Sequence, residues 1–224
     1  MHAAYVCVSA TRIKIPVLCC VFEVYFSDFP VHVQTFAERW FESGGGNTQI
    51  LTDVEVESML SSSSEEAAAH NLVLLGGPAS NSIARRLQNV LPIQFLPASE
   101  SRNADKYSGA SMQGTEPEDL GAYHYGIADC LFGPSGYSLV TLGPLDGEGS
   151  GVVAVVDGQD VKAFMGAGEM LVDGLFDVNH WQHRQADYVI ADSGVGTKGA
   201  RAVVATGFWG NSWEYVQEAS HLDC

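Results

Sequence analysis

Short, uninterrupted apolar segments alternate with amphipathic segments over the first hundred residues of the chain. The apolar segments are residues 13–26, 48–53, 71–77 and 92–97. Between them, residues 31–46, 54–62 and 82–90 place their apolar side chains at helical spacing. Fully apolar strands that alternate with helices are typical of a parallel sheet covered on both faces. The pattern therefore predicts the order β-α-β-α-β-α-β.

The second half of the chain follows a looser pattern. Residues 98–120 form a long polar stretch, which predicts an extended loop. Two strands flank the turn sequence "DGEGSG", a helix is expected over 161–176, and two more strands precede a short closing helix at 212–220. We expect a single α/β domain over residues 1–224. It would have three layers and a mainly parallel, flavodoxin-like or Rossmann-like sheet, extended by two antiparallel strands near 137–157.

Composition and charge narrow the class of protein. The chain has 224 residues, of which 46% are hydrophobic and 17% charged, as in globular proteins. Its net charge is −16 with only 11 Lys and Arg, which argues against binding to nucleic acid or to an anionic membrane surface. The apolar segment 15–26 contains Glu23 and is too short to span a bilayer, so we interpret it as a core strand and not as a signal peptide. These features favour a cytoplasmic protein.

The five cysteines carry no recognisable motif. Their number is odd, and no two are separated by two residues as in CxxC. This arrangement indicates neither a disulfide framework nor a thiolate zinc site, and it predicts buried, inert thiols.

A sharp polar turn follows the apolar strand "NLVLL". Gly76 and Gly77 allow close approach of a ligand or another backbone, and Asn81 can cap the helix that follows. The turn either holds a small polar ligand or simply joins strand to helix, and we favour the second interpretation. Asp160 and Asn211 also follow predicted strands, so they complete the ligand-binding candidates Gly76, Gly77, Asn81, Asp160 and Asn211. The segment lacks GxGxxG and the Walker motif, and no cofactor is predicted.

Other candidate motifs are weaker. The chain has no GxSxG pentapeptide, so independent Ser-His-Asp catalysis is not expected, and no catalytic residue is assigned. "DSGVGTKG" (192–199) is read as a hairpin between strands and not as a phosphate loop. His180 and His183 are interpreted as ordinary histidines and not as metal ligands. Carboxylates at strand ends, Asp157, Asp187 and Asp192 among them, either do acid–base work or cap helices and turns.

The segment "GFWGNSW" near the C-terminus gathers large aromatic side chains at a strand end. Phe208, Trp209 and Trp213 form either a docking surface for a neighbouring domain or the closing plug of the core.

Three segments in this order resemble the C-terminal α/β region of large fungal and bacterial serine hydrolases of the α/β-hydrolase, prolyl-oligopeptidase-like type. The residues that carry the resemblance lie at three strand ends: Gly76, Gly77, Pro78 and Asn81; Gly158, Gln159 and Asp160; Gly207, Phe208, Trp209, Asn211 and Trp213. The likeness covers roughly residues 50–218, and residues 1–45 depart from it. It implies a non-catalytic accessory or interaction domain whose partner is a hydrolase domain in the same or another chain. The alternative is a small polar-ligand site or hydrolytic enzyme at the carboxyl ends of the strands, built on Asn81, Asp160 and Asn211.

Overall fold

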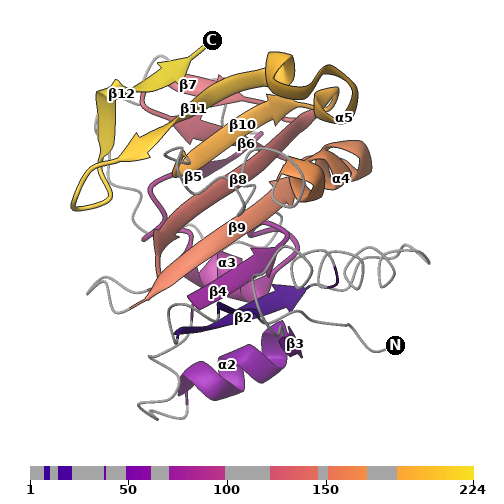
Figure 1. Cartoon of the computed structure of the whole chain (residues 1–224), viewed down its shortest axis with the longest axis vertical. Helices are drawn as coiled ribbons and strands as arrows, with labels where there is room; N and C mark the ends of the chain where they lie inside the picture. Colours follow the sequence, from indigo (N-terminus) through magenta and orange to yellow (C-terminus); the bar gives the residue numbers. More distant parts are fainter. Residues whose placement is uncertain are drawn as a thin grey trace.

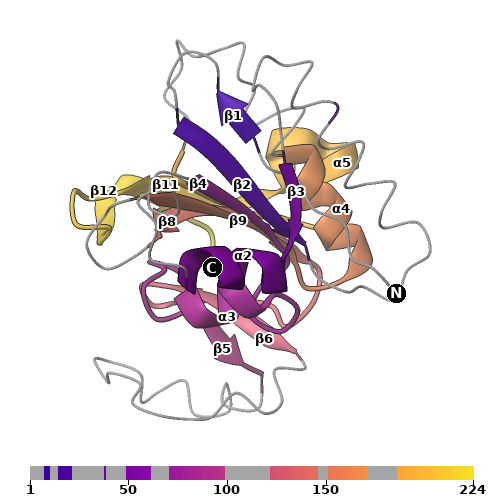
Figure 2. The same ribbon diagram turned by 90° about the horizontal axis from the view of Figure 1, so that it is seen from below.

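A large mixed sheet forms the centre of the protein. The computed structural model describes residues 8–10, 15–21, 38, 49–61, 71–98, 122–145, 151–170 and 186–224. Within these residues nine strands form one sheet in the order β1-β2-β4-β9-β8-β10-β11-β12, with β3 paired to β2. Its strands are β1 (Val8–Ala10), β2 (Ile15–Val21), β3 (Gln49–Thr52), β4 (Asn71–Leu75), β8 (Tyr137–Pro144), β9 (Val152–Gly158), β10 (Tyr188–Asp192), β11 (Val203–Trp209) and β12 (Tyr215–Leu222). Figure 1 shows β2, β4, β9, β8, β10 and β11 following one another across the molecule, and Figure 2 shows β1 beside β2.

The expected three-layer α/β fold with a mainly parallel, flavodoxin-like or Rossmann-like sheet is wrong, because most strand pairs are antiparallel and a second sheet covers one face of the large sheet. Only β2–β3, β2–β4 and β4–β9 pair in parallel. The pairs β1–β2, β8–β9, β8–β10, β10–β11 and β11–β12 are antiparallel. A parallel pair needs a long crossover connection, whereas several strands of the second half follow one another through short connections that reverse the chain. The two antiparallel strands near 137–157 are confirmed as β8 and β9, although they are part of a mostly antiparallel half.

A second, three-stranded antiparallel sheet lies against the large one. It consists of β5 (Gln94–Pro97), β6 (Tyr123–Ile127) and β7 (Cys130–Phe132) in the order β5-β6-β7. The strand expected at 92–97 is therefore present but belongs to this sheet. In β5, Gln94 is exposed and Phe95 is buried, as expected for a strand with one face exposed to solvent.

The two faces of the large sheet bury different elements. On the first face, Leu72, Leu74, Val153 and Val155 pack with the small sheet and with α3 (Ser82–Leu87). On the second face, Val73 and Leu75 belong to a cluster that includes α4 (Val161–Glu169) and α5 (Val195–Lys198). Figure 2 shows α3, β5 and β6 on one side of the sheet and α4 and α5 on the other. Successive residues of these strands therefore pack into two different hydrophobic cores, one on each face of the sheet.

Helix starts follow the local signals in the sequence. In α2 (Asp53–Ser61), Thr52 Oγ1 accepts from Glu55 N at 2.8 Å and Glu55 Oε2 accepts from Thr52 N at 2.7 Å. This reciprocal pair is a capping box. The Asp53 carboxylate, at the same turn, accepts from Ser82 N at 3.3 Å and links the start of α2 to that of α3.

Two local predictions in the second half are wrong. The segment expected as a closing helix is strand β12, because pairing of Tyr215 with Trp209 and of Leu222 with Ala205 overrides the helix propensity of "EYVQEAS". The segment 192–199, expected as a hairpin, instead forms α5 and leads into the 3₁₀ helix η6 (Gly199–Ala202). Apart from Glu38, which is helical, and Ala98, the residues of 31–46 and 98–120 fall outside the described residues, as do His180 and His183.

The prediction that the cysteines are free thiols fails for one pair. Cys130 in β7 and Cys224 at the C-terminus form a disulfide, with their Cα atoms 5.9 Å apart. They are 94 positions apart in the sequence, so spacing carries no signal of their proximity. In the part of the chain that the structure describes, no helix is long and apolar enough to cross a membrane.

Candidate functional site

Two neighbouring parallel strands send their following helices to opposite faces of the sheet. β4 and β9 pair from Leu72 with Val153 to Leu75 with Val156. The helix after β4, α3, packs on the first face, and the helix after β9, α4, packs on the second. Chains that diverge in this way leave a crevice beyond the carboxyl ends of the strands, where ligands of α/β sheets commonly bind. We name this place the β4/β9 switch point.

The Gly76–Gly77 turn lies at this switch point and touches the end of β9 closely. Gly76 has φ +98°, which favours glycine, and its N–H donates to Val156 O at 2.8 Å. A Cβ on Gly77 would lie 2.5 Å from both Asp157 Oδ2 and Tyr123 Oη. The second glycine is therefore required by a close approach within the protein.

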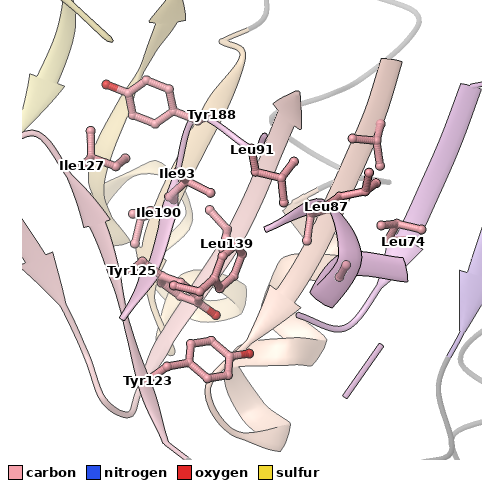
Figure 3. Packing of buried hydrophobic residues seen from close by; sticks show 14 of the residues in the cluster. Leu74, Leu87, Leu91, Ile93, Tyr123, Tyr125, Ile127, Leu139, Tyr188 and Ile190 are labelled. Atoms are coloured by element: carbon pink, nitrogen blue, oxygen red, sulfur yellow. The ribbon is translucent and has the colours of Figure 1, made fainter. Parts of the chain in front are cut away.

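Asp157 is the buried carboxylate of the switch point, with a side chain only 2% exposed. Its Oδ1 accepts from Gly77 N at 2.8 Å. Its Oδ2 accepts from Tyr123 Oη at 2.5 Å and from Tyr125 Oη at 2.9 Å. Figure 3 shows both tyrosines reaching from β6 into the core between the sheets. We name Asp157, Tyr123 and Tyr125 the Asp–Tyr cluster.

Burial dominates the electrostatics of this cluster. Desolvation raises the pKa of Asp157, against the hydrogen bonds from Tyr123, Tyr125 and the backbone N–H groups of Gly158 and Gly77, which favour the carboxylate. Desolvation and the nearby Asp157 charge also raise the pKa of both tyrosines well above 10.0. The phenols therefore remain protonated donors and are poor nucleophiles at neutral pH.

Gln159 makes a second link between the switch point and the small sheet. Its Nε2 donates to Tyr123 O and to Phe132 O, each at 2.9 Å. Its buried Oε1 has no hydrogen-bond partner among the described residues. Gly133 has φ +124°, and a Cβ there would overlap the Gln159 amide, so this glycine makes room for the link.

Asn81 is a buried helix cap. Its Oδ1 accepts from Ile83 N and Ala84 N, both at 3.0 Å, and its Nδ2 donates to Leu75 O at 3.3 Å. The side chain is fully buried. Its hydrogen bonds thus fasten the end of β4 to the start of α3.

Asp160 and Asn211 lie in separate places. Asp160 caps α4 by accepting from Ala163 N at 2.8 Å, and its other oxygen accepts from Gly136 N at 3.0 Å. Asn211 is exposed in the turn after β11. Because β9, β8, β10 and β11 are successively antiparallel, β11 ends at the opposite edge of the sheet from β9. The structure therefore does not bring Asn81, Asp160 and Asn211 into one pocket.

The aromatic residues near the C-terminus divide between core and surface. Trp209 is 8% exposed, stacks on Tyr188 with ring centroids 4.4 Å apart, and donates from Nε1 to Leu142 O at 3.0 Å. Trp213 is half-buried and packs against the same core cluster. Phe208 is half-buried. Trp209 thus closes the core, while Phe208 and Trp213 retain exposed surface.

The chemistry available at the switch point is a carboxylate, two phenols and an amide. The strand-end position singled out Asp157 in the sequence, but its phenol partners were missed. The signal for them was the alternation of Tyr123 and Tyr125 around His124, which places both phenols on one face of a strand. Among the described residues no group of acidic, histidine or cysteine side chains could hold a metal ion.

Comparison with protein-family models, curated proteins and solved structures finds no match to this chain.

Proposed function

We propose that this chain is a non-catalytic accessory or interaction domain, similar to the C-terminal region of large α/β-hydrolases. The observation that carries the proposal is the Asp–Tyr cluster, which fills the β4/β9 switch point with the protein's own groups. A catalytic acid or base must reach the reacting atom at hydrogen-bond distance. Both oxygens of Asp157 instead accept from Gly77, Tyr123 and Tyr125.

The remaining polar candidates have structural roles that fit this proposal. Asn81 and Asp160 cap helices, and Gln159 links β9 to the small sheet. The alternative function, a small polar-ligand or hydrolytic site, has one observation in its favour, the unpartnered Gln159 Oε1 among the described residues. An amide oxygen could accept a hydrogen bond from a ligand but supplies no proton-transfer group.

The β11–β12 hairpin supplies the contact surface in this proposal. Gly210 N donates to Glu214 O and Trp213 N donates to Gly210 O, which is a three-residue hairpin loop whose last position is left-handed. Trp213 occupies that position with φ +63°, where glycine would be favoured by about 1–2 kcal/mol. A half-buried tryptophan at a strained position supports a role in binding. We assign Phe208 and Trp213 to contact with an α/β-hydrolase domain in the same or another chain.

The compartment also forms part of the proposal. The charge and apolar pattern favoured the cytoplasm, where thiols are kept reduced. The Cys130–Cys224 bond instead supports an oxidising compartment, because disulfides persist mainly there.

An activity assay separates the two functions. Purified protein is tested with p-nitrophenyl acetate and with aminoacyl p-nitroanilides, beside the variants Asp157→Asn and Asn81→Ala. We expect no rate above buffer for any of them. Hydrolysis by the wild type that disappears in Asp157→Asn, while circular dichroism shows that variant folded, would contradict the non-catalytic role.

The partner is tested by sequencing the full-length transcript and its neighbouring genes. An α/β-hydrolase domain in the same reading frame or an adjacent gene supports the proposal, and its absence from both contradicts it. With that domain purified, calorimetric titration should give at least about tenfold weaker binding for Trp213→Gly, since aromatic anchors dominate interfaces. Val54→Ser, which changes a 68% exposed side chain on α2, serves as the matched control and should bind as the wild type does.

A further inference from the structure

We propose that the Cys130–Cys224 disulfide is a redox-controlled latch that holds strand β12 on the large sheet, and that a dithiol reductant releases this strand while the rest of the fold persists. The bond joins β7 in the small sheet to the second residue after β12. Figure 1 shows the C-terminus lying close to β7 at the end of β12. The inference does not depend on the proposed interaction function.

Strand β12 pairs with β11 through only four of its eight residues. Ala205, Thr206 and Gly207 pair with Leu222, His221 and Ser220, but the next pair is Trp209 with Tyr215. One residue, Phe208, therefore faces four residues, 216–219, which form an irregular bulge. Ser220 Oγ donates to Val216 O across it at 2.7 Å. A bulge of this kind interrupts the backbone ladder.

Side-chain burial in β12 is also low. Every residue of Tyr215–Leu222 is half-buried or exposed, and only Tyr215 and Leu222 pack partly against the core. On the other side of β11, the first four residues of β10 are all buried. Apolar burial supplies most of the free energy that fixes a strand in a sheet, and β12 buries little apolar surface. The disulfide at its end therefore contributes a large share of the free energy that keeps β12 paired with β11.

The two bonded cysteines differ in exposure, and the proposal places the attack of the reductant at the more exposed one. Cys224 is exposed, whereas Cys130 is only 7% exposed. A thiolate of the reductant attacks Cys224 Sγ, and the Cys130 thiolate leaves with the electron pair and takes up a proton. The second thiol of the reductant then displaces Cys224 as a thiol. The protein gains two electrons and two protons, and the dithiol becomes a disulfide.

Release of β12 changes the surface of the protein. Residues 205–207 of β11 lose their partners and present unpaired N–H and C=O groups at a new sheet edge. β11 itself remains paired with β10 through Tyr188 with Gly207 and the neighbouring pairs.

Hydrogen–deuterium exchange with dithiothreitol as the reductant tests the latch. In peptides covering 205–207 and 215–222, reduction should speed amide exchange by about tenfold or more, while peptides from β4, β6 and β9 exchange as before. Cys224→Ser should show the same fast exchange without reductant and no further response to it. Cys7→Ser, which leaves both bonded cysteines in place, should respond as the wild type does.

Intact mass spectrometry confirms the state of the bond in each sample, since reduction adds two hydrogens. Three results would overturn the proposal. One is unchanged exchange at 215–222 in fully reduced protein. Another is equal acceleration in β6 and β9, which would make the bond a support of the whole fold. The third is an intact mass of the wild-type protein that is the same with and without dithiothreitol.

Discussion

Removing the Tyr125 hydroxyl perturbs the Asp–Tyr cluster with little change in shape. Tyr125 is fully buried, and its Oη donates to Asp157 Oδ2 at 2.9 Å. In Tyr125→Phe the ring and its edge-to-face contact with Phe95, centroids 5.9 Å apart, can remain. The substitution therefore tests the hydrogen bond more than the packing.

The expected loss follows from the bonds that survive. A hydrogen bond to a charged acceptor contributes about 1.5–3 kcal/mol to stability. Asp157 Oδ2 still accepts from Tyr123 at 2.5 Å, so the carboxylate is not left unpaired. We expect Tyr125→Phe to lower the free energy of unfolding at pH 7 by about 2 kcal/mol, or the Tm by roughly 4–8 °C for a chain of this size.

Tyr123→Phe removes the shorter bond and should cost about 3 kcal/mol, and the double variant should exceed the sum of the two because Oδ2 then has no phenol donor. Urea unfolding followed by tryptophan fluorescence measures these differences. Tyr215→Phe, at a half-buried tyrosine on β12, is the control and should change stability by less than about 0.5 kcal/mol. If both cluster variants also stay within about 0.5 kcal/mol of the wild type, the hydroxyls do not hold Asp157.

Three further predictions concern the same region. Asn81→Ala should lower stability by about 2–3 kcal/mol in urea unfolding, because it removes a helix cap and leaves Leu75 O without its amide donor; a change below about 0.5 kcal/mol would contradict the capping role. Gly77→Ala should destabilise by about 2 kcal/mol or more in a thermal melt, because the added Cβ would push Asp157 away from Tyr123. Because burial raises the pKa of Asp157 in the folded state, its contribution to stability is full below the unfolded pKa of about 3.9 and is lost as pH rises through the folded pKa. The unfolding free energy of Asp157→Asn, measured from pH 3 upwards, should lack this decline, and identical pH profiles for the two proteins would refute the assignment.

The sequence predicts the strands better than their partners. The apolar segments at 48–53 and 71–77 are β3 and β4, and both join β2 in parallel as expected. The segment 92–97 is also a strand, yet it pairs with β6 in the other sheet. Apolar periodicity reports that a segment is buried, but the neighbour it pairs with depends on contacts distant in sequence.

The C-terminal errors share this cause. Within residues 215–222, Gln217, Glu218 and Ala219 favour a helix, and the strand state of the segment depends on pairing with β11. The Cys130–Cys224 bond likewise depends on β12 reaching β7, so neither the count nor the spacing of the cysteines could reveal it.

The sequence indicates the strand-end residues of the candidate site but not the phenols that bind them. The polar turn at Gly76 follows β4 and the carboxylate Asp157 lies at the end of β9, and these neighbouring carboxyl ends are positions that strand patterns can indicate. The phenols that close the site come from β6, more than 30 positions away, as the separations of 34 and 32 residues from Asp157 show. The position of these phenols depends on how the small sheet packs against the large one, which local sequence patterns do not encode.

The closed switch point is tested most directly by the titration of Asp157 itself. Carbon-13 NMR of the side-chain carboxyl, assigned with Asp157→Asn, follows its protonation as the pH changes. A buried carboxylate held by Tyr123, Tyr125 and Gly77 should titrate with a pKa above the ordinary value of 3.8, and further above it in Tyr125→Phe. An ordinary pKa that Tyr125→Phe leaves unchanged would mean that water reaches the carboxylate and that the switch point is open.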